Sequence, residues 1–282
     1  MTAIEIEQYF QYHNSNMKLL KIGFEHIRNQ IKTLHKTKDK TNNYTYLQND
    51  SSTEKIELLK IEKSLSRILS GIQVSWAEES IKRLFYEKNL LTEIQIEYLL
   101  QRPALDQRWY KTLKVVFCIA YDLVPIGDEI CDTVKIENER RNLGDELVDQ
   151  YLELKNIITN QLVPNFSIRN KVQHGEWEFA FKPSYSIEYS QDLTDKVNYE
   201  NIITATSRYT LVNAFYQMLV DLGRFKSNSF ALDSMATPFE YFYDDFIRKI
   251  KFETTKIDNP DLGLFITQKL EKEIRGQQYK TR

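Results

Sequence analysis

The chain has 282 residues, enough to bury a substantial core as one large domain or two small ones. With 41% hydrophobic and 28% charged residues, its composition is that of a folded globular protein and excludes wholesale disorder. The formal net charge of −2 excludes the strong positive field of proteins that coat nucleic acid, so any nucleic-acid contact would need a local patch.

The sequence predicts an all-α fold, because only 8 glycines and 6 prolines occur and few segments alternate with a period of two. A first helix is expected from Ile4 to Leu34. The polar stretch 36–53 that follows has no hydrophobic periodicity and predicts a linker or long loop. We therefore divide the chain into an N-terminal helix with its linker, residues 1–50, and a helical domain, residues 51–282.

Further helices are expected along the second part of the chain. The stretch 52–89 carries one apolar stripe, with an interruption near Gly71. Thr92 followed by Gln95 is a capping-box pattern that opens a short helix. Nearly every face of 109–123 is apolar, so this helix should lie at the centre of the fold. The remaining predicted helices cover 143–162, which Pro164 should end, then 199–225 and 238–256.

One segment has a different hydrophobic periodicity from the helices. Trp177, Phe179 and Phe181 occupy alternate positions, and a Lys-Pro-Ser turn and a second short run follow them. This alternation predicts a short β-hairpin over residues 177–189.

Several common functional motifs are missing from the sequence. It has no GxxxxGK[ST] phosphate loop, no GxGxxG turn, no GxSxG elbow and no visible ligand set for a metal, so we expect no cofactor. The two cysteines, Cys118 and Cys131, form no CxxC pair, and Cys118 is expected in the core. No apolar run approaches the roughly 18 residues that cross a bilayer. Met1–Glu7 lacks the order of a secretory signal, which predicts a cytoplasmic protein with no membrane partner.

The stretch "SIRNKVQHGEW", residues 167–177, carries the clearest functional signal. Pro164 suits the first turn of a helix and Gly175 suits its C-terminal stop, so a short helix is expected from Pro164 to His174.

The two faces of this short helix differ in chemistry. At about 100° per residue, Ile168 and Val172 share one face, and Asn170 and His174 share a face almost opposite to it. Arg169 lies on a flank between them. If the aliphatic pair packs inward, the asparagine and the histidine point towards solvent, a ligand or a second protomer. A purely structural alternative is a histidine favoured by the helix dipole beside an arginine on a solvated face.

The heptapeptide "RNKVQHG" resembles the signature of the HEPN superfamily, an α-helical group whose motif is an arginine, a polar residue and a histidine after four to six intervening residues. Arg169, Asn170 and His174 match that motif position by position, and the similarity extends over about Lys55 to Phe225. The resemblance implies a HEPN-like helical bundle, here with an extra N-terminal helix. One departure is Glu176, which stands where some members carry a tyrosine that a partner enzyme modifies.

The resemblance also implies a function: a metal-independent endoribonuclease that acts as a toxin or antiphage-defence effector. RNA supplies the 2′-hydroxyl as nucleophile, and imidazole can exchange a proton near neutral pH, the role expected of His174. Arg169 would stabilise charge on the phosphoryl oxygens, and Asn170 would orient the histidine or bind phosphate. The expected partners are the RNA substrate, a second copy of the chain with the 169–174 helix at the interface, and an antitoxin or sensor protein. The alternative is a non-catalytic HEPN module that binds nucleotide or protein as a scaffold.

Overall fold

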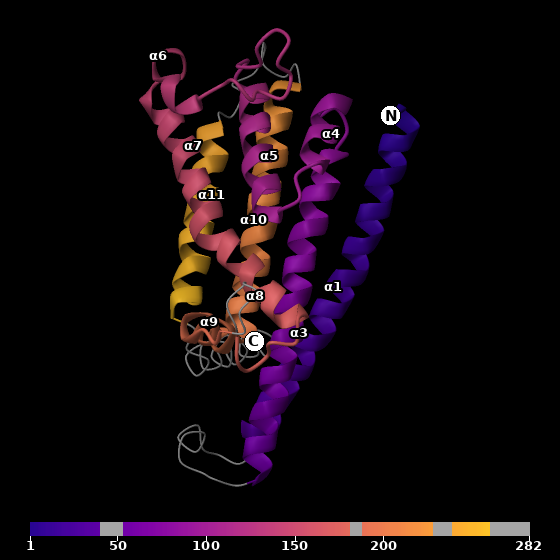
Figure 1. Cartoon of the computed structure of the whole chain (residues 1–282), viewed down its shortest axis with the longest axis vertical. Coiled ribbons are helices and arrows are strands. Elements are labelled where there is room, and N and C mark those ends of the chain that lie inside the picture. The colour runs from indigo at the N-terminus through magenta and orange to yellow at the C-terminus, as the bar shows by residue number, and fades with distance from the viewer. Residues whose placement is uncertain (40–52, 181–187, 228–238, 260–282) are drawn as a thin grey trace, which may run out of the picture.

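The computed structural model describes residues 1–39, 53–180, 188–227 and 239–259, which form a bundle of long helices (Figure 1). No strand is assigned in these ranges, and Tyr189 alone takes part in an isolated β-bridge. The all-α prediction is therefore confirmed for the described residues. The elements are α1 (Ala3–Asp39), α3 (Thr53–Phe85), α4 (Glu93–Leu100), α5 (Leu105–Ala120), the 3₁₀ turn η1 (Ile136–Asn138), α6 (Arg140–Leu143), α7 (Asp145–Ile157), the π-helical turn η2 (Ile158–Leu162), α8 (Val163–Gln173), α9 (Gln191–Tyr199), α10 (Ile202–Ser227) and α11 (Phe239–Asp258).

Helices α1 and α3 run antiparallel to each other along one side of the bundle (Figure 1). The inner face of α1 buries Met17, Phe24 and Ile31, which recur every seven residues and so stay on one side of the helix. Leu19 and Ile22 lie on the opposite face and are 70% and 67% exposed. The predicted first helix is confirmed, but its outer face is more apolar than packing against α3 requires.

Helix α3 is continuous, and the predicted interruption near Gly71 is wrong. A Cβ atom at Gly71 would meet nothing within 4 Å, so this glycine relieves no close contact and simply sits in a helix that tertiary packing stabilises. α3 contacts α1, α5, α8 and α10 and therefore joins both sides of the bundle. The predicted capping box before α4 is confirmed, with the Thr92 side chain bound to the Gln95 amide and the Gln95 side chain bound to the Thr92 amide.

The core lies where α3, α5 and α10 meet. The side chains of Trp109, Leu113 and Phe117 on α5 are fully buried, which confirms the prediction that this helix is central. Gly223 on α10 has a steric purpose, since a Cβ there would lie 2.1 Å from Leu90 Cδ1. The free Cys118 is buried in the same core, as expected.

Two helix boundaries differ from the prediction. The helix expected over 143–162 does not end at Pro164, because α7 passes through the π-helical turn η2 directly into α8, where the proline occupies the first turn. Proline is tolerated there since the first amides of a helix have no intrahelical acceptor. The sequence also missed α9, which begins after Ser190 and ends at Tyr199, where the predicted helix was to begin.

The predicted β-hairpin is not confirmed. Residues 177–180 are not assigned as a strand, and residues 181–187 lie outside the described ranges. The backbone of Ser190 does donate a 2.9 Å hydrogen bond to the carbonyl of Ala180, so the two ends of the segment lie side by side.

Candidate functional site

The candidate site lies at the C-terminal end of α8, where the backbone ends in a well-defined motif. Gly175 has φ +80°, a left-handed conformation that glycine adopts without a Cβ penalty. Its amide donates to the Val172 carbonyl (3.1 Å), and the Glu176 amide donates to the Lys171 carbonyl (3.0 Å). These two bonds form a Schellman motif and confirm the predicted stop. His174 is the cap residue of the helix, and its backbone is therefore held on both sides.

The two faces of α8 are those that the sequence predicted. Ile168 and Val172 are 5% and 7% exposed and pack against α9. Asn170 and His174 are exposed. Arg169 lies in α8 beside Asn170, and its side chain is outside what the structure describes. The structure thus brings an amide and an imidazole together on one open face, next to the backbone of the arginine.

Glu176, which follows the motif, forms an ion pair with Lys171. Lys171 Nζ lies 3.2 Å from a carboxylate oxygen of Glu176, and both side chains are mostly buried, 12% and 19% exposed. The negative charge that Glu176 adds close to His174 is therefore partly neutralised. This role of Lys171 was not predicted from the sequence.

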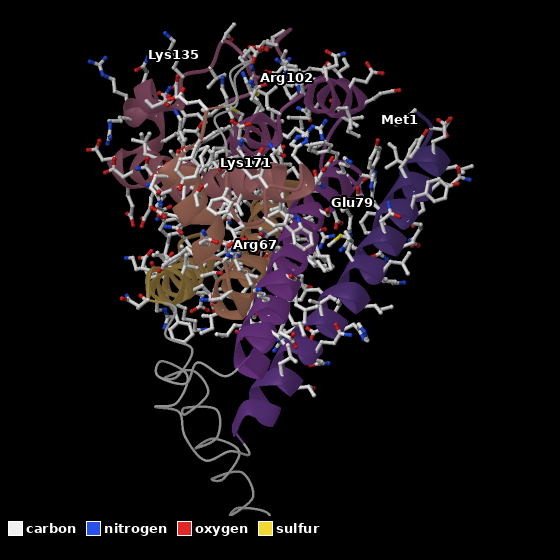
Figure 2. The ribbon with its side chains drawn as sticks, turned by 60° about the horizontal axis from the view of Figure 1, so that its bottom comes forward. Met1, Arg67, Glu79, Arg102, Lys135 and Lys171 are labelled. Atoms are coloured by element: carbon white, nitrogen blue, oxygen red, sulfur yellow. The ribbon has the colours of Figure 1, made fainter. Side chains whose placement is uncertain are left out.

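Trp177 is held by one hydrogen bond to α8 and one to α3. Its indole N–H donates to the Val172 carbonyl (2.8 Å), and its own carbonyl accepts from Arg67 Nε (3.2 Å). Arg67 comes from α3 and lies well inside the outline of the molecule, in contrast to Met1 at the edge (Figure 2). A helix far away in the sequence therefore fixes the segment that follows His174.

Arg67 is 1% exposed and uses all three of its guanidinium nitrogens. Nη1 donates to the Glu200 carbonyl (3.0 Å) and Nη2 donates to Asn198 Oδ1 (3.2 Å). Burial lowers the pKa of Arg67, and the nearby Glu200 opposes that shift. A buried cation of this kind is stable only with such partners, so α3, α9 and the Trp177 segment are joined at one point.

The Glu200 side chain completes this buried group. It forms an ion pair with Arg208 in which the two side chains are 1% and 9% exposed. It also accepts hydrogen bonds from Ser70 (2.9 Å) and Thr204 (3.4 Å). We call Arg67, Ser70, Glu200, Thr204 and Arg208 the lower polar cluster. The sequence analysis missed it, although Arg67, Ser70 and Gln73 recur at three-residue spacing on α3 as a polar stripe that turns out to be buried.

The other described histidines have structural contacts. His13 Nδ1 lies 2.9 Å from a carboxylate oxygen of Glu79, which links α1 to α3, and His26 pairs with Gln30 on α1. Within the described ranges, no three histidine, cysteine, aspartate or glutamate side chains gather as a metal-binding group. Nor is any described helix long and apolar enough to cross a bilayer.

A scan against protein-family models and searches of curated proteins and of solved structures found no match to this chain.

Proposed function

We propose that the chain is a metal-independent endoribonuclease of the HEPN type, with Arg169, Asn170 and His174 as its catalytic residues. The observation that carries the proposal is the geometry at the end of α8. Asn170 and His174 share an exposed face opposite the buried Ile168 and Val172. An imidazole held by a fixed backbone and open to solvent suits proton transfer to a bound substrate better than it suits a structural role.

The proposed reaction uses the RNA as its own nucleophile. His174 accepts the proton of the 2′-hydroxyl while the 2′-oxygen bonds to the adjacent phosphorus, and the bond from phosphorus to the 5′-oxygen breaks as that oxygen takes a proton from water. Arg169 stabilises the charge that builds on the phosphoryl oxygens, and Asn170 orients the imidazole. The products are a 2′,3′-cyclic phosphate and a 5′-hydroxyl.

The active form in this proposal is a homodimer that pairs two α8 helices. The support is that Asn170 and His174 are both exposed on one face of α8. A two-fold axis beside this face would bring two copies of the motif to one phosphate. We further propose a cytoplasmic toxin or defence effector that an antitoxin or sensor protein controls.

A scaffold function is the second candidate, and the outer face of α1 favours it. Ile4, Tyr12, Leu19 and Ile22 are between 60% and 72% exposed and lie within one arc of the helix. Exposed apolar side chains that gather in this way commonly mark a protein-binding surface. A HEPN module that only binds partners would use such a surface and would have no need of His174.

The experiment that separates the two functions is an RNA cleavage assay in EDTA. The purified chain is incubated with a mixture of RNAs, and the ends of the fragments are analysed. We expect cleavage, with 2′,3′-cyclic phosphate at one end and 5′-hydroxyl at the other. Intact RNA would contradict the endoribonuclease and favour the scaffold, whereas cleavage that needs added metal would contradict the metal-independent mechanism.

A further inference from the structure

Three aromatic side chains that follow His174 in the sequence are exposed. Trp177 is 38%, Phe179 57% and Tyr189 44% exposed. The large apolar side chains of α5 and α10, by contrast, are mostly buried. Aromatic rings are costly to leave in water, which suggests that a ligand covers them.

The backbone beneath these rings is firmly held. Ala180 follows Phe179 and is fully buried, with its amide bound to Thr194 Oγ1 (2.9 Å) and its carbonyl bound to the Ser190 amide (2.9 Å). The second bond places Tyr189 beside Phe179, and their ring centroids are 6.4 Å apart with a 60° tilt. Together with the two hydrogen bonds of Trp177, this arrangement presents exposed rings on a fixed support.

The two glutamates on either side of Trp177 each lie near a lysine. Glu176 is paired with Lys171, and Glu178 lies 3.9 Å from Lys63. An anionic ligand would therefore approach the rings without meeting a group of unpaired carboxylates among these residues.

We propose that Trp177, Phe179 and Tyr189 form a stacking platform for unpaired RNA bases, so that the substrate is single-stranded RNA. This inference rests on the proposed ribonuclease function, because it places the platform three to fifteen residues from the catalytic histidine. Every base has a flat π-face that can stack on an exposed aromatic ring, but in a duplex those faces are covered by neighbouring base pairs. A strand that crosses His174 would have its neighbouring bases within reach of the platform.

The test is a binding measurement with RNA that cannot be cut by 2′-hydroxyl attack. A fluorescent single-stranded oligonucleotide with 2′-O-methyl groups throughout is titrated with the full-length wild-type chain, and fluorescence anisotropy reports the Kd. We expect the wild type to bind this strand and to bind the matched duplex more weakly. Phe179→Ala and Tyr189→Ala should each weaken single-strand binding roughly 5- to 150-fold, the range for loss of one stacked base.

Phe242→Ala is the matched control. Phe242 is also exposed, at 45%, but lies near the start of α11, whereas the other end of α11 contacts Tyr199 of α9. Phe242 therefore lies about 22 Å along α11 from the contact with Tyr199. Circular dichroism melting should show that all three variants fold like the wild type.

Each of the other possible outcomes contradicts either the stacking platform or the ribonuclease. Equal binding by wild type and Phe179→Ala, a preference for the duplex, or no binding at all would overturn the platform. A Phe179→Ala variant that loses dimer mass in light scattering without losing RNA affinity would assign these rings to a protein contact and also overturn it. Stacking-dependent binding without any cleavage of unmodified RNA would sustain the platform and refute the ribonuclease.

Discussion

Two buried carboxylates are bound by arginines at different levels of α3, Glu87 near its C-terminal end and Glu200 near its middle, and they differ in their access to water. Glu87, just after α3, accepts from Tyr216 (2.5 Å) and pairs with Arg83 and Arg224, whose side chains are 24% and 46% exposed. Glu200 in the lower polar cluster pairs with Arg208, which is only 9% exposed. The same pairing of charges is thus partly hydrated near the end of the helix and almost dry near its middle.

The two clusters also differ in what they hold. The Glu87 group joins α3 to α10 and touches no part of the candidate site. The lower polar cluster includes Arg67, which binds the Trp177 carbonyl three residues after His174. A dry, fully bonded network is the more rigid of the two, since each partner depends on the others. The comparison suggests that the lower polar cluster positions the site, whereas the Glu87 group only stabilises the bundle.

The largest expected effect comes from removing either carboxylate. Glu200→Ala leaves Arg208 buried without its counter-charge and should lower the free energy of unfolding by about 3–5 kcal/mol. Glu87→Ala should cost less, because Arg224 and Arg83 can turn towards water. Urea denaturation of both variants checks the order. A larger loss for Glu87→Ala would break the distinction between a dry and a hydrated cluster.

A third carboxylate, Glu79 of α3, gives a pH-dependent effect. Burial raises its pKa, but hydrogen bonds from His13 and Asn16 and the charge of Lys82 outweigh that and lower the pKa to about 2. Since the folded-state pKa lies below the ordinary value of 4.5, its stabilisation is present above pH 4.5 and is lost as the pH falls towards 2. We expect a loss of at most about 3 kcal/mol, because the pair is partly hydrated.

The measurement for Glu79 is the melting temperature between pH 5 and pH 2. Glu79→Gln removes the titrating group and should flatten the part of the curve that belongs to it. An identical pH profile for the wild type and Glu79→Gln would contradict the assignment.

Arg67→Met should have a smaller global effect and a clear local one. It leaves the Glu200 and Trp177 carbonyls without their donor, at a cost of about 1–3 kcal/mol for a buried acceptor. Hydrogen exchange at the Gly175 and Glu176 amides should become faster, because the segment after α8 loses its anchor. Arg83→Met is the matched control and should leave these two amides as slow as in the wild type. Unchanged exchange in Arg67→Met would show that the lower polar cluster does not position the site.

The smallest expected effects come from two glycines. Gly175→Ala forces a Cβ into the left-handed region and should cost about 1–2 kcal/mol. Gly71→Ala, in the interior of α3 with open space around its Cβ, should instead stabilise the chain by about 0.5–1 kcal/mol. Thermal melting of the pair tests whether the turn after His174 depends on glycine as well as on Arg67. Equal effects of the same sign would show that the turn after His174 does not depend on glycine.

Local signals predicted part of this structure. The capping box at Thr92 and Gln95 and the Pro164–Gly175 helix with its two faces depend on residues a few positions apart, so the sequence contains them. The continuity of α3 through Gly71 and the π-helical turn before Pro164 depend on packing against other helices, which overrides local preference. Arg67 acts on Trp177 from 110 residues away. No spacing rule connects those two residues, so the support beneath the candidate site appears only in the folded chain.

The most direct test of the catalytic assignment is RNA cleavage by His174→Ala. Because His174 is exposed, the variant should keep the melting temperature and the solution mass of the wild type while its cleavage rate in EDTA falls by roughly 10²- to 10⁴-fold. Asn170→Ala should lose less of the cleavage activity. Arg169→Lys should recover little of the activity that Arg169→Ala loses. The control is His26→Ala, at an exposed histidine on α1, which should cut RNA like the wild type. Wild-type cleavage by a folded His174→Ala dimer would contradict the account.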